Sequence, residues 1–194
     1  MMRRYAILID GSNLHETTKA LGLALDHNKL LNFFEGELVR AMYFTAIPED
    51  RSEPCSIRPM LDRLEYNGYS VVTKFTKKYL KDDGSVKVKG NMDMDMAIHA
   101  INVAPFVSDI VLVTGDGDFV CLVEHLQIKY GVRVWCMSTR EAVGQDGRKL
   151  SLVSDDLRRK SDFFIDMADP IIMRKLSRED RATAVPPRFS FSKS

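Results

Sequence analysis

Apolar residues occur along the chain in short runs, and segments of helical periodicity separate these runs. Such runs predict β-strands, which cover residues 5–9, 38–44, 70–74, 110–113 and 132–137. The run over residues 110–113 has no polar position. This is typical of a strand that is covered on both faces in a parallel sheet.

Apolar positions three and four residues apart predict helices between the later strands. The first helix ends at Asn67-Gly68, the second breaks before Pro105, and the third ends before Gly131. Alternating strands and helices form right-handed βαβ units. We therefore predict an α/β fold, a three-layer doubly wound parallel sheet.

Two regions depart from this alternation. Residues 77–89 place Asp83-Gly84 between two strand-like segments, which predicts a β-hairpin inserted at about residues 75–90. Beyond Ile172 the chain is rich in Arg, Ser and Pro, which predicts a basic, disordered tail over residues 173–194. The remaining residues, 1–172, are expected to form one domain.

Composition favours a soluble globular protein, because 45% of the 194 residues are hydrophobic and 28% are charged. No apolar run approaches the ~20 residues that span a bilayer, and we expect no signal peptide. The three cysteines include no CxxC pair, which favours a reducing, cytoplasmic location and gives no zinc site.

The formal net charge is only +1, which argues against a uniformly basic nucleic-acid binder. From Arg174 onward, six basic and two acidic residues give +4, so the residues before it sum to −3. The position of the charges is therefore more informative than their sum.

Four aspartates are expected to converge at the carboxyl edge of the sheet. Asp10 ends the first strand, and Asp116 and Asp118 follow the strand over 110–113. Asp93 lies in the first turn of a crossover helix, which must begin at the same edge. Ligands of open α/β sheets bind at this edge.

All-oxygen ligands without His or Cys suit a hard cation, Mg²⁺ or Mn²⁺. Such a cation can activate water and stabilise the leaving oxygen of a phosphodiester. Each residue also has a simpler explanation: Asp10-Gly11 ends a strand while Asn13 caps the next helix, Asp93 complements a helix dipole, and Asp118 is an N-cap. Their convergence on one edge favours the metal site.

The same helix carries two further polar candidates. On a helix, Asp95 points about 200° away from Asp93 and lies on the same face as His99. The two could simply pair, and a lone His beside an apolar stripe is more often a packed residue than a catalyst. Met92, Met94 and Met96 are expected to pack the helix.

These residues resemble the signature of NYN domains, which belong to the PIN-like nuclease superfamily, and the LabA-like group in particular. The similarity covers roughly residues 4–168. It is carried by the segments Ile9-Asp10-Gly11-Ser12-Asn13-Leu14, Lys89-Gly90-Asn91-Met92-Asp93, Thr114-Gly115-Asp116-Gly117-Asp118-Phe119, Ser154-Asp155-Asp156-Leu157 and Ser161-Asp162-Phe163-Phe164-Ile165-Asp166.

The resemblance implies a sheet of strand order 3-2-1-4-5 and an acidic pocket that binds Mg²⁺ or Mn²⁺ for RNA cleavage. The metal-binding and catalytic carboxylates would be Asp10, Asp93, Asp116 and Asp118, and Asn13 would assist them. Candidates for orienting these groups without binding the metal directly are Thr114, Ser12, Asp95 and His99. His99 stands where relatives commonly have another Asp, which would alter the surroundings of the site, supply a neutral ligand or weaken the activity.

Basic and aromatic residues of the predicted hairpin are candidates for nucleic-acid binding, because lysines neutralise phosphates and aromatic rings stack on unpaired bases. They are Lys74, Lys77, Lys78, Tyr79, Lys87 and Lys89. Lys89 is the strongest candidate because it directly precedes the Asp93 motif. The alternative is a hairpin whose lysines serve solubility. A second basic group, Arg140, Arg148 and Lys149, is expected to flank the cleft.

The leading functional hypothesis is a metal-dependent (endo)ribonuclease acting on single-stranded or structured RNA. The alternative is a non-catalytic RNA- or protein-binding regulator that uses the same pocket; a homodimer is left open. A haloacid-dehalogenase-like phosphatase is disfavoured because Asp10 is not followed by the required second Asp. A dinucleotide-binding dehydrogenase is disfavoured because no GxGxxG follows the first strand.

Overall fold

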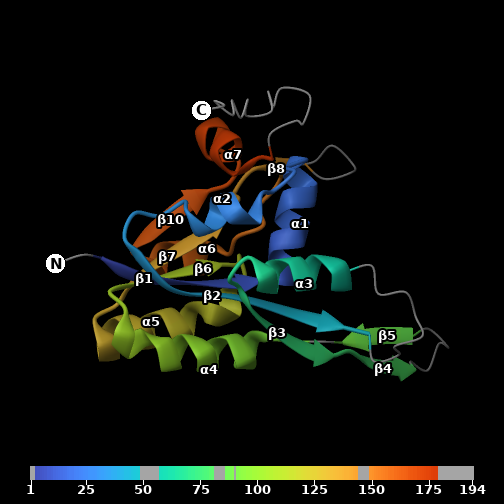
Figure 1. Ribbon diagram of the computed structural model, residues 1–194, viewed down its shortest axis with the longest axis horizontal. Coiled ribbons are helices and arrows are strands. Elements are labelled where there is room, and N and C mark those ends of the chain that lie inside the picture. Colours follow the sequence, from blue (N-terminus) through green and yellow to red (C-terminus); the bar gives the residue numbers. More distant parts are fainter. Residues whose placement is uncertain (1–2, 49–56, 81–85, 90, 144–148, 179–194) are drawn as a thin grey trace, which may run out of the picture.

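The computed structural model describes residues 3–48, 57–80, 86–89, 91–143 and 149–178 (Figure 1). The elements follow one another as β1 (Arg4–Asp10), α1 (Gly11–Leu21), α2 (His27–Leu31), β2 (Glu37–Ile47), α3 (Arg58–Tyr66), β3 (Ser70–Phe75), β4 (Lys77–Leu80), β5 (Val86–Lys89), α4 (Asp93–Val103), η1 (Ala104–Phe106), β6 (Asp109–Val113), η2 (Gly117–Phe119), α5 (Val120–Tyr130), β7 (Arg133–Ser138), β8 (Ala142–Val143), β9 (Lys149–Leu150), α6 (Asp155–Lys160), β10 (Phe163–Asp166) and α7 (Pro170–Leu176).

A six-stranded parallel sheet forms the centre of the molecule, in the order β10-β7-β6-β1-β2-β3. The central strand β1 pairs on both sides, so that Ile7 lies opposite Ala41 of β2 and Val111 of β6. The five predicted strands are present in the predicted order 3-2-1-4-5, and β10 adds a sixth strand at one edge. The predicted α/β class is confirmed.

Helices cover both faces of the sheet, because alternate residues of the strands are apolar on both sides. Ala6 and Leu8 of β1 belong to the core beneath α4, α5 and α6. Tyr5, Ile7 and Ile9 belong to a second core beneath α1, α2, α3 and α7. In Figure 1, α4 and α5 lie below the sheet and α1, α2 and α7 lie above it.

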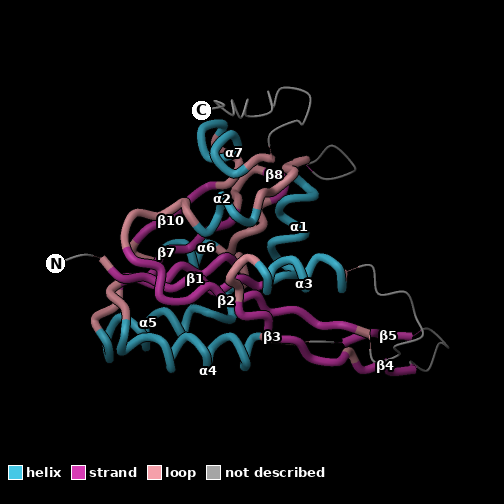
Figure 2. Tube along the Cα trace, viewed as in Figure 1, coloured by secondary structure: helices cyan, strands magenta, loops and turns pink. Residues whose placement is uncertain are grey.

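The inserted segment forms an antiparallel pair of strands, β4 and β5, as predicted. Figure 2 shows this hairpin projecting beyond the ends of β2 and β3. Its turn, residues 81–85, lies outside the described residues. The hairpin thus extends from the carboxyl edge of the sheet.

The boundary of the predicted tail differs from the structure. Helix α7 continues past residue 172 to Leu176, and Ser177 forms an antiparallel bridge with Leu25. This helix contributes Leu176 to the core, so the domain extends beyond residue 172. Residues 179–194 of the predicted tail lie outside the described residues. Within the described part of the chain, no helix has the length and apolarity to cross a membrane.

Candidate metal centre

Three carboxylates meet at the carboxyl edge of the sheet. Asp93 begins α4, whereas Asp116 and Asp118 lie in the loop and 3-10 turn after β6. Each offers an oxygen that lies within 4.8 Å of an oxygen of the other two. Because carboxylate oxygens are the ligands that Mg²⁺ and Mn²⁺ prefer, these three residues fit a hard divalent cation.

Asp10 lies beside this group but is held differently. It lines a pocket of about 300 Å³ together with Asp93 and Asp116, and its side chain is buried, with 7% of the residue exposed. Asp10 itself is the N-cap of α1, so the simpler explanation that Asn13 caps this helix does not apply. Asp10 combines the capping role with a place in the pocket.

Five donors surround the Asp10 carboxylate. Its Oδ1 accepts hydrogen bonds from the backbone and hydroxyl of Ser12 and from the backbone of Asn13. Its Oδ2 accepts from Asn13 Nδ2 at 2.7 Å and from Thr114 Oγ1 at 3.4 Å. Hydrogen bonds therefore occupy Oδ1 more fully, which leaves Oδ2 as the oxygen better able to accept a cation.

Asn13 and Thr114 connect the loops that carry the acids. Asn13 Oδ1 accepts from the backbone N–H of Gly115 at 3.1 Å. Thr114 is buried, and its hydroxyl accepts from the backbone N–H of Asp116 at 3.2 Å. Asp116 in turn caps the 3-10 turn by accepting from the Asp118 N–H, so Asp116, rather than Asp118, is the N-cap.

Burial and the close approach of the other carboxylates both disfavour the ionised form of Asp93. Burial raises its pKa, and the negative charges of Asp116, Asp10 and Asp118 raise it further. A hydrogen bond to Asn91 acts in the opposite direction. Neighbouring carboxylates disfavour one another's ionised form, and a bound cation would remove this penalty.

The segment over residues 151–154 supports the acidic loop, and sequence reasoning did not identify this role. Its Ser154 N–H donates to the carbonyl of Gly115 at 2.9 Å. A Cβ added at Gly115 would overlap the carbonyl oxygen of Leu152, and one added at Gly117 would lie 2.9 Å from Ser154 Oγ. The glycines flanking Asp116 are the sequence signal for this close approach.

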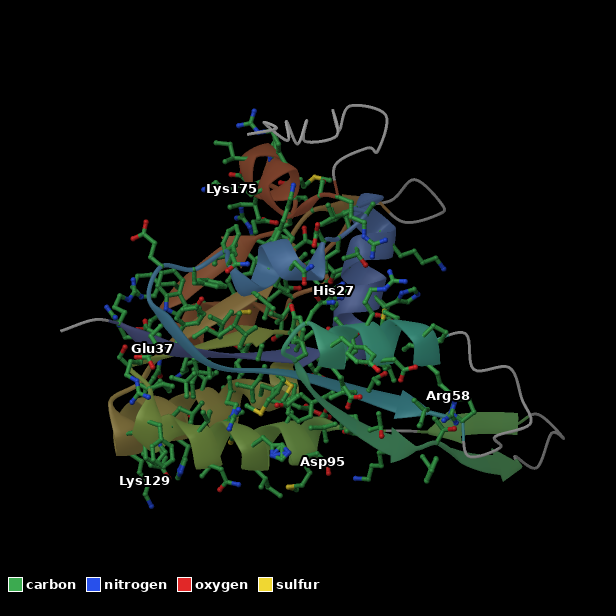
Figure 3. All side chains as sticks on the ribbon, viewed as in Figure 1. His27, Glu37, Arg58, Asp95, Lys129 and Lys175 are labelled. Carbon is green, nitrogen blue, oxygen red and sulfur yellow. The ribbon has the colours of Figure 1, made fainter. Side chains whose placement is uncertain are left out.

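Two of the predicted supporting residues neither line the acidic pocket nor bond its aspartates. Asp95, labelled in Figure 3 at the right-hand end of α4, pairs with Lys74 at 2.9 Å rather than with His99. His99 packs against the ring of Phe44, with centroids 5.4 Å apart, and lines a separate groove. Ser12 lines the acidic pocket and donates to Asp10.

The structure describes the side chains of two of the predicted basic residues, Lys74 and Arg140. Lys74 forms the ion pair with Asp95, and Arg140 pairs with Asp166 at 3.1 Å. Arg148 lies outside the described residues. So do the side chains of the other basic or aromatic candidates, which are Lys77, Lys78, Tyr79, Lys87, Lys89 and Lys149. Their binding roles stay predictions.

Comparison with known proteins gives consistent results. The family model of the NYN domain matches residues 4–168. The low amplitude and bright protein LabA of Synechococcus elongatus is 30% identical over 172 residues, which cover 86% of this chain and 84% of LabA. A crystal structure of a protein of unknown function from Vibrio parahaemolyticus superposes with a TM-score of 0.67 and 28% identity, covering 87% of this chain and 94% of that one.

The sequence motifs, the sheet order and the matched family model agree over the same residues. The strand order places the acidic loops of β1 and β6 side by side, as the resemblance implied. The chain belongs to the NYN domain family, within the PIN-like nuclease superfamily and similar to LabA.

Proposed function

We propose that this protein is a ribonuclease that hydrolyses RNA phosphodiester bonds with Mg²⁺ or Mn²⁺. Asp93, Asp116 and Asp118 would hold the cation, with Oδ2 of Asp10 beside them. The observation that carries the proposal is the approach of three carboxylate oxygens to within 4.8 Å of one another. When bound, such a cation acts as a Lewis acid toward water and phosphate oxygens.

The chain's own residues would orient the reacting groups. Asn13 and Thr114 hold Oδ2 of Asp10 and also bond the backbone of the loop that carries Asp116. This shared bonding would keep acids from distant segments at a constant separation. Ordered supporting hydrogen bonds of this kind typically contribute 10–100-fold to metal affinity or activity.

The hairpin would bring RNA to the pocket. It leaves the sheet beside the acidic edge, and its strand β5 leads into α4 and Asp93. We expect Lys77, Lys87, Lys89 and Tyr79 to bind the nucleic acid, because its backbone charge dominates affinity. The acidic pocket alone would repel phosphates, so a separate basic element is required.

The experiment compares cleavage of labelled RNA by the wild-type protein, by Asp116→Asn and by the matched control Asp62→Asn, an exposed residue of α3 on the opposite face of the sheet from α4. Cleavage by the wild type should need Mn²⁺ or Mg²⁺ and stop with EDTA. Asp116→Asn should lower the rate by about 100-fold or more, and Asp62→Asn should leave it unchanged. Equal rates for Asp116→Asn and the wild type would contradict the proposal.

The second candidate is a regulator that binds RNA or protein without cleaving it. The 30% identity to LabA, whose name describes an effect on amplitude and brightness, is the observation that favours it. This function predicts metal-dependent binding without turnover. Retained binding with no cleavage of varied RNAs by the wild type would establish it over the nuclease.

A further inference from the structure

A groove of about 610 Å³ runs along the face of the sheet that carries α4. Helix α4 packs over β1 and β2, whereas β3 is the edge strand of the sheet. Val39 and Val72 of the strands form one apolar wall, and Val103 with Phe106 forms the other. The groove therefore occupies the space between α4 and the sheet edge.

The groove and the acidic pocket share no lining residue, but both are built on β2 and α4. Strand β2 contributes Met42 to the groove and Thr45 to the pocket, and α4 contributes His99 to the groove and Asp93 to the pocket. His99 lies six positions after Asp93 on the helix, which is about 9 Å along the axis. A strand bound at the acidic pocket would therefore reach the groove by following α4 toward its C-terminal end.

An ion pair joins the sheet edge to α4, and neither of its partners lines the groove or the pocket. Lys74 of edge strand β3 reaches Asp95 of α4, with Nζ and Oδ2 2.9 Å apart. Both side chains are exposed enough to exchange with solvent or with a ligand. Exposed pairs of this kind contribute about 0–1 kcal/mol, so a phosphate could compete for Lys74 at little cost.

The groove differs from the pocket in charge. None of the described residues that line it is acidic, and Arg4 and Arg40 are basic. Arg4 pairs with Glu37 at 3.3 Å, whereas Arg40 is exposed and has no ion-pair partner within the described part of the chain. An anion is thus attracted to the groove and repelled by the metal-free pocket.

Two rings and an amide add recognition groups. Phe106 is 60% exposed, directly after Pro105, and the half-buried His99 ring packs on Phe44. Asn102 is exposed on the same wall. Exposed rings beside unpaired cations are typical of sites that stack unpaired bases and bind the backbone.

We propose that the groove between α4 and β3 binds a single-stranded RNA segment flanking the phosphate that is cleaved. Arg40 would contact a phosphate, and Phe106 with His99 would stack on bases. A duplex has its bases stacked inside, so these rings favour an unpaired strand. The inference rests on the proposed function, because it places the scissile phosphate at the acidic pocket.

The test measures binding of a fluorescein-labelled 12-nucleotide oligouridine, with Ca²⁺ replacing Mn²⁺ so that binding is separated from cleavage. The variants are Arg40→Glu and Phe106→Ala. Matched controls are Arg63→Glu and Tyr66→Ala, two exposed residues of α3 outside the groove. All four proteins should keep the circular dichroism spectrum and Mn²⁺ affinity of the wild type.

We expect each groove variant to weaken RNA binding by about 10-fold, as for the loss of one stacking or phosphate contact. Arg40→Glu should also reduce the slope of log K against log salt by about 1. The controls should change affinity less than twofold. 4-Thiouridine placed in the RNA should crosslink to residues 97–107.

Unchanged RNA affinity in both groove variants would overturn the inference, even if the wild type cleaves RNA. Absence of any RNA binding by the wild type would also overturn it. A change of oligomeric state in light scattering, with RNA affinity unchanged, would identify the groove as a contact between two copies of the chain. Groove-dependent binding without cleavage would uphold the groove and contradict only the nuclease.

Discussion

The side-chain oxygen of Asn13 accepts a hydrogen bond from the backbone N–H of Gly115 at 3.1 Å. The amide nitrogen of the same side chain donates to Asp10 at 2.7 Å. One amide therefore joins the ends of two adjacent strands that are far apart in sequence. A carboxylate could not replace it, because the position requires both a donor and an acceptor.

Removing this amide should weaken the metal site. We expect Asn13→Ala to lower Mn²⁺ affinity by about 10–100-fold, measured by titration calorimetry. Asn67→Ala is the matched control, because Asn67 bonds a helix end on α3 instead. Equal affinities in all three proteins would show that Asn13 does not position the acids.

Neutralising Asp93 should stabilise the metal-free protein. Burial and neighbouring charges raise its pKa, so its ionised form lowers stability at any pH above that raised pKa. The stability is regained as the pH falls through the raised pKa toward 3.8, the ordinary value. Asp93→Asn should therefore raise the metal-free Tm at neutral pH and reduce the further rise on adding Mn²⁺. A lower Tm would contradict this account.

Asp109 should set the acid stability of the fold. It lies at the opposite edge of the sheet, 2% exposed, and accepts hydrogen bonds from Arg3, Arg133 and Trp135. Burial opposes its ionisation, but these donors outweigh burial and hold its pKa well below the usual range. The stability it contributes is present above the unfolded-state pKa and is lost as the pH falls below it.

Replacing Asp109 by Asn should cost about 1–3 kcal/mol, because Arg3 and Arg133 lose their carboxylate partner but are themselves partly exposed to water. Urea unfolding followed by the fluorescence of Trp135, the single tryptophan, measures this change. Asp155→Asn is the surface control, with its side chain 82% exposed, and should stay within about 0.5 kcal/mol. A small effect at Asp109 would mean that its ion pairs contribute little.

The two glycines beside Asp116 should differ in how well they tolerate replacement by Ala. Gly115→Ala would place a methyl group against the backbone oxygen of Leu152, so we expect loss of cleavage and about 1–3 kcal/mol of destabilisation. Gly117→Ala meets only the side chain of Ser154, which can move. Adding Ser154→Ala should restore any activity that Gly117→Ala loses. Equal losses of cleavage and of stability in the two variants would contradict this prediction.

The two faces of the hairpin should contribute unequally to RNA binding. The pairing register opposes Lys77 with Lys89 and Tyr79 with Lys87, so these positions share one face. Position 78 lies on the other face, opposite Val88. Lys77→Glu with Lys89→Glu should weaken RNA binding more than Lys78→Glu combined with Lys19→Glu, a change at an exposed lysine of α1. Equal losses would mean that only total charge matters.

The order of strands and helices was predictable because periodicity and turn residues are local properties of the chain. Strand β10 was not predicted, although its residues were part of a recognised motif. Its Phe163 and Phe164 pair with Trp135 and Cys136 of β7, which precedes β10 in the chain by several other elements, and β10 is itself the edge strand. The end of α7 was similarly hidden, because Leu176 is buried in a core that consists mostly of segments distant in sequence.

By itself, the sequence determined the fold class, the family and the arrival of four aspartates at one sheet edge, since parallel strands end together. The tertiary structure decided their individual roles. It placed donors from two loops around Asp10 and paired Asp95 with Lys74. It also placed His99 in the lining of a separate groove. These outcomes depend on the directions of side chains from segments brought together by folding, and spacing along one segment does not specify them.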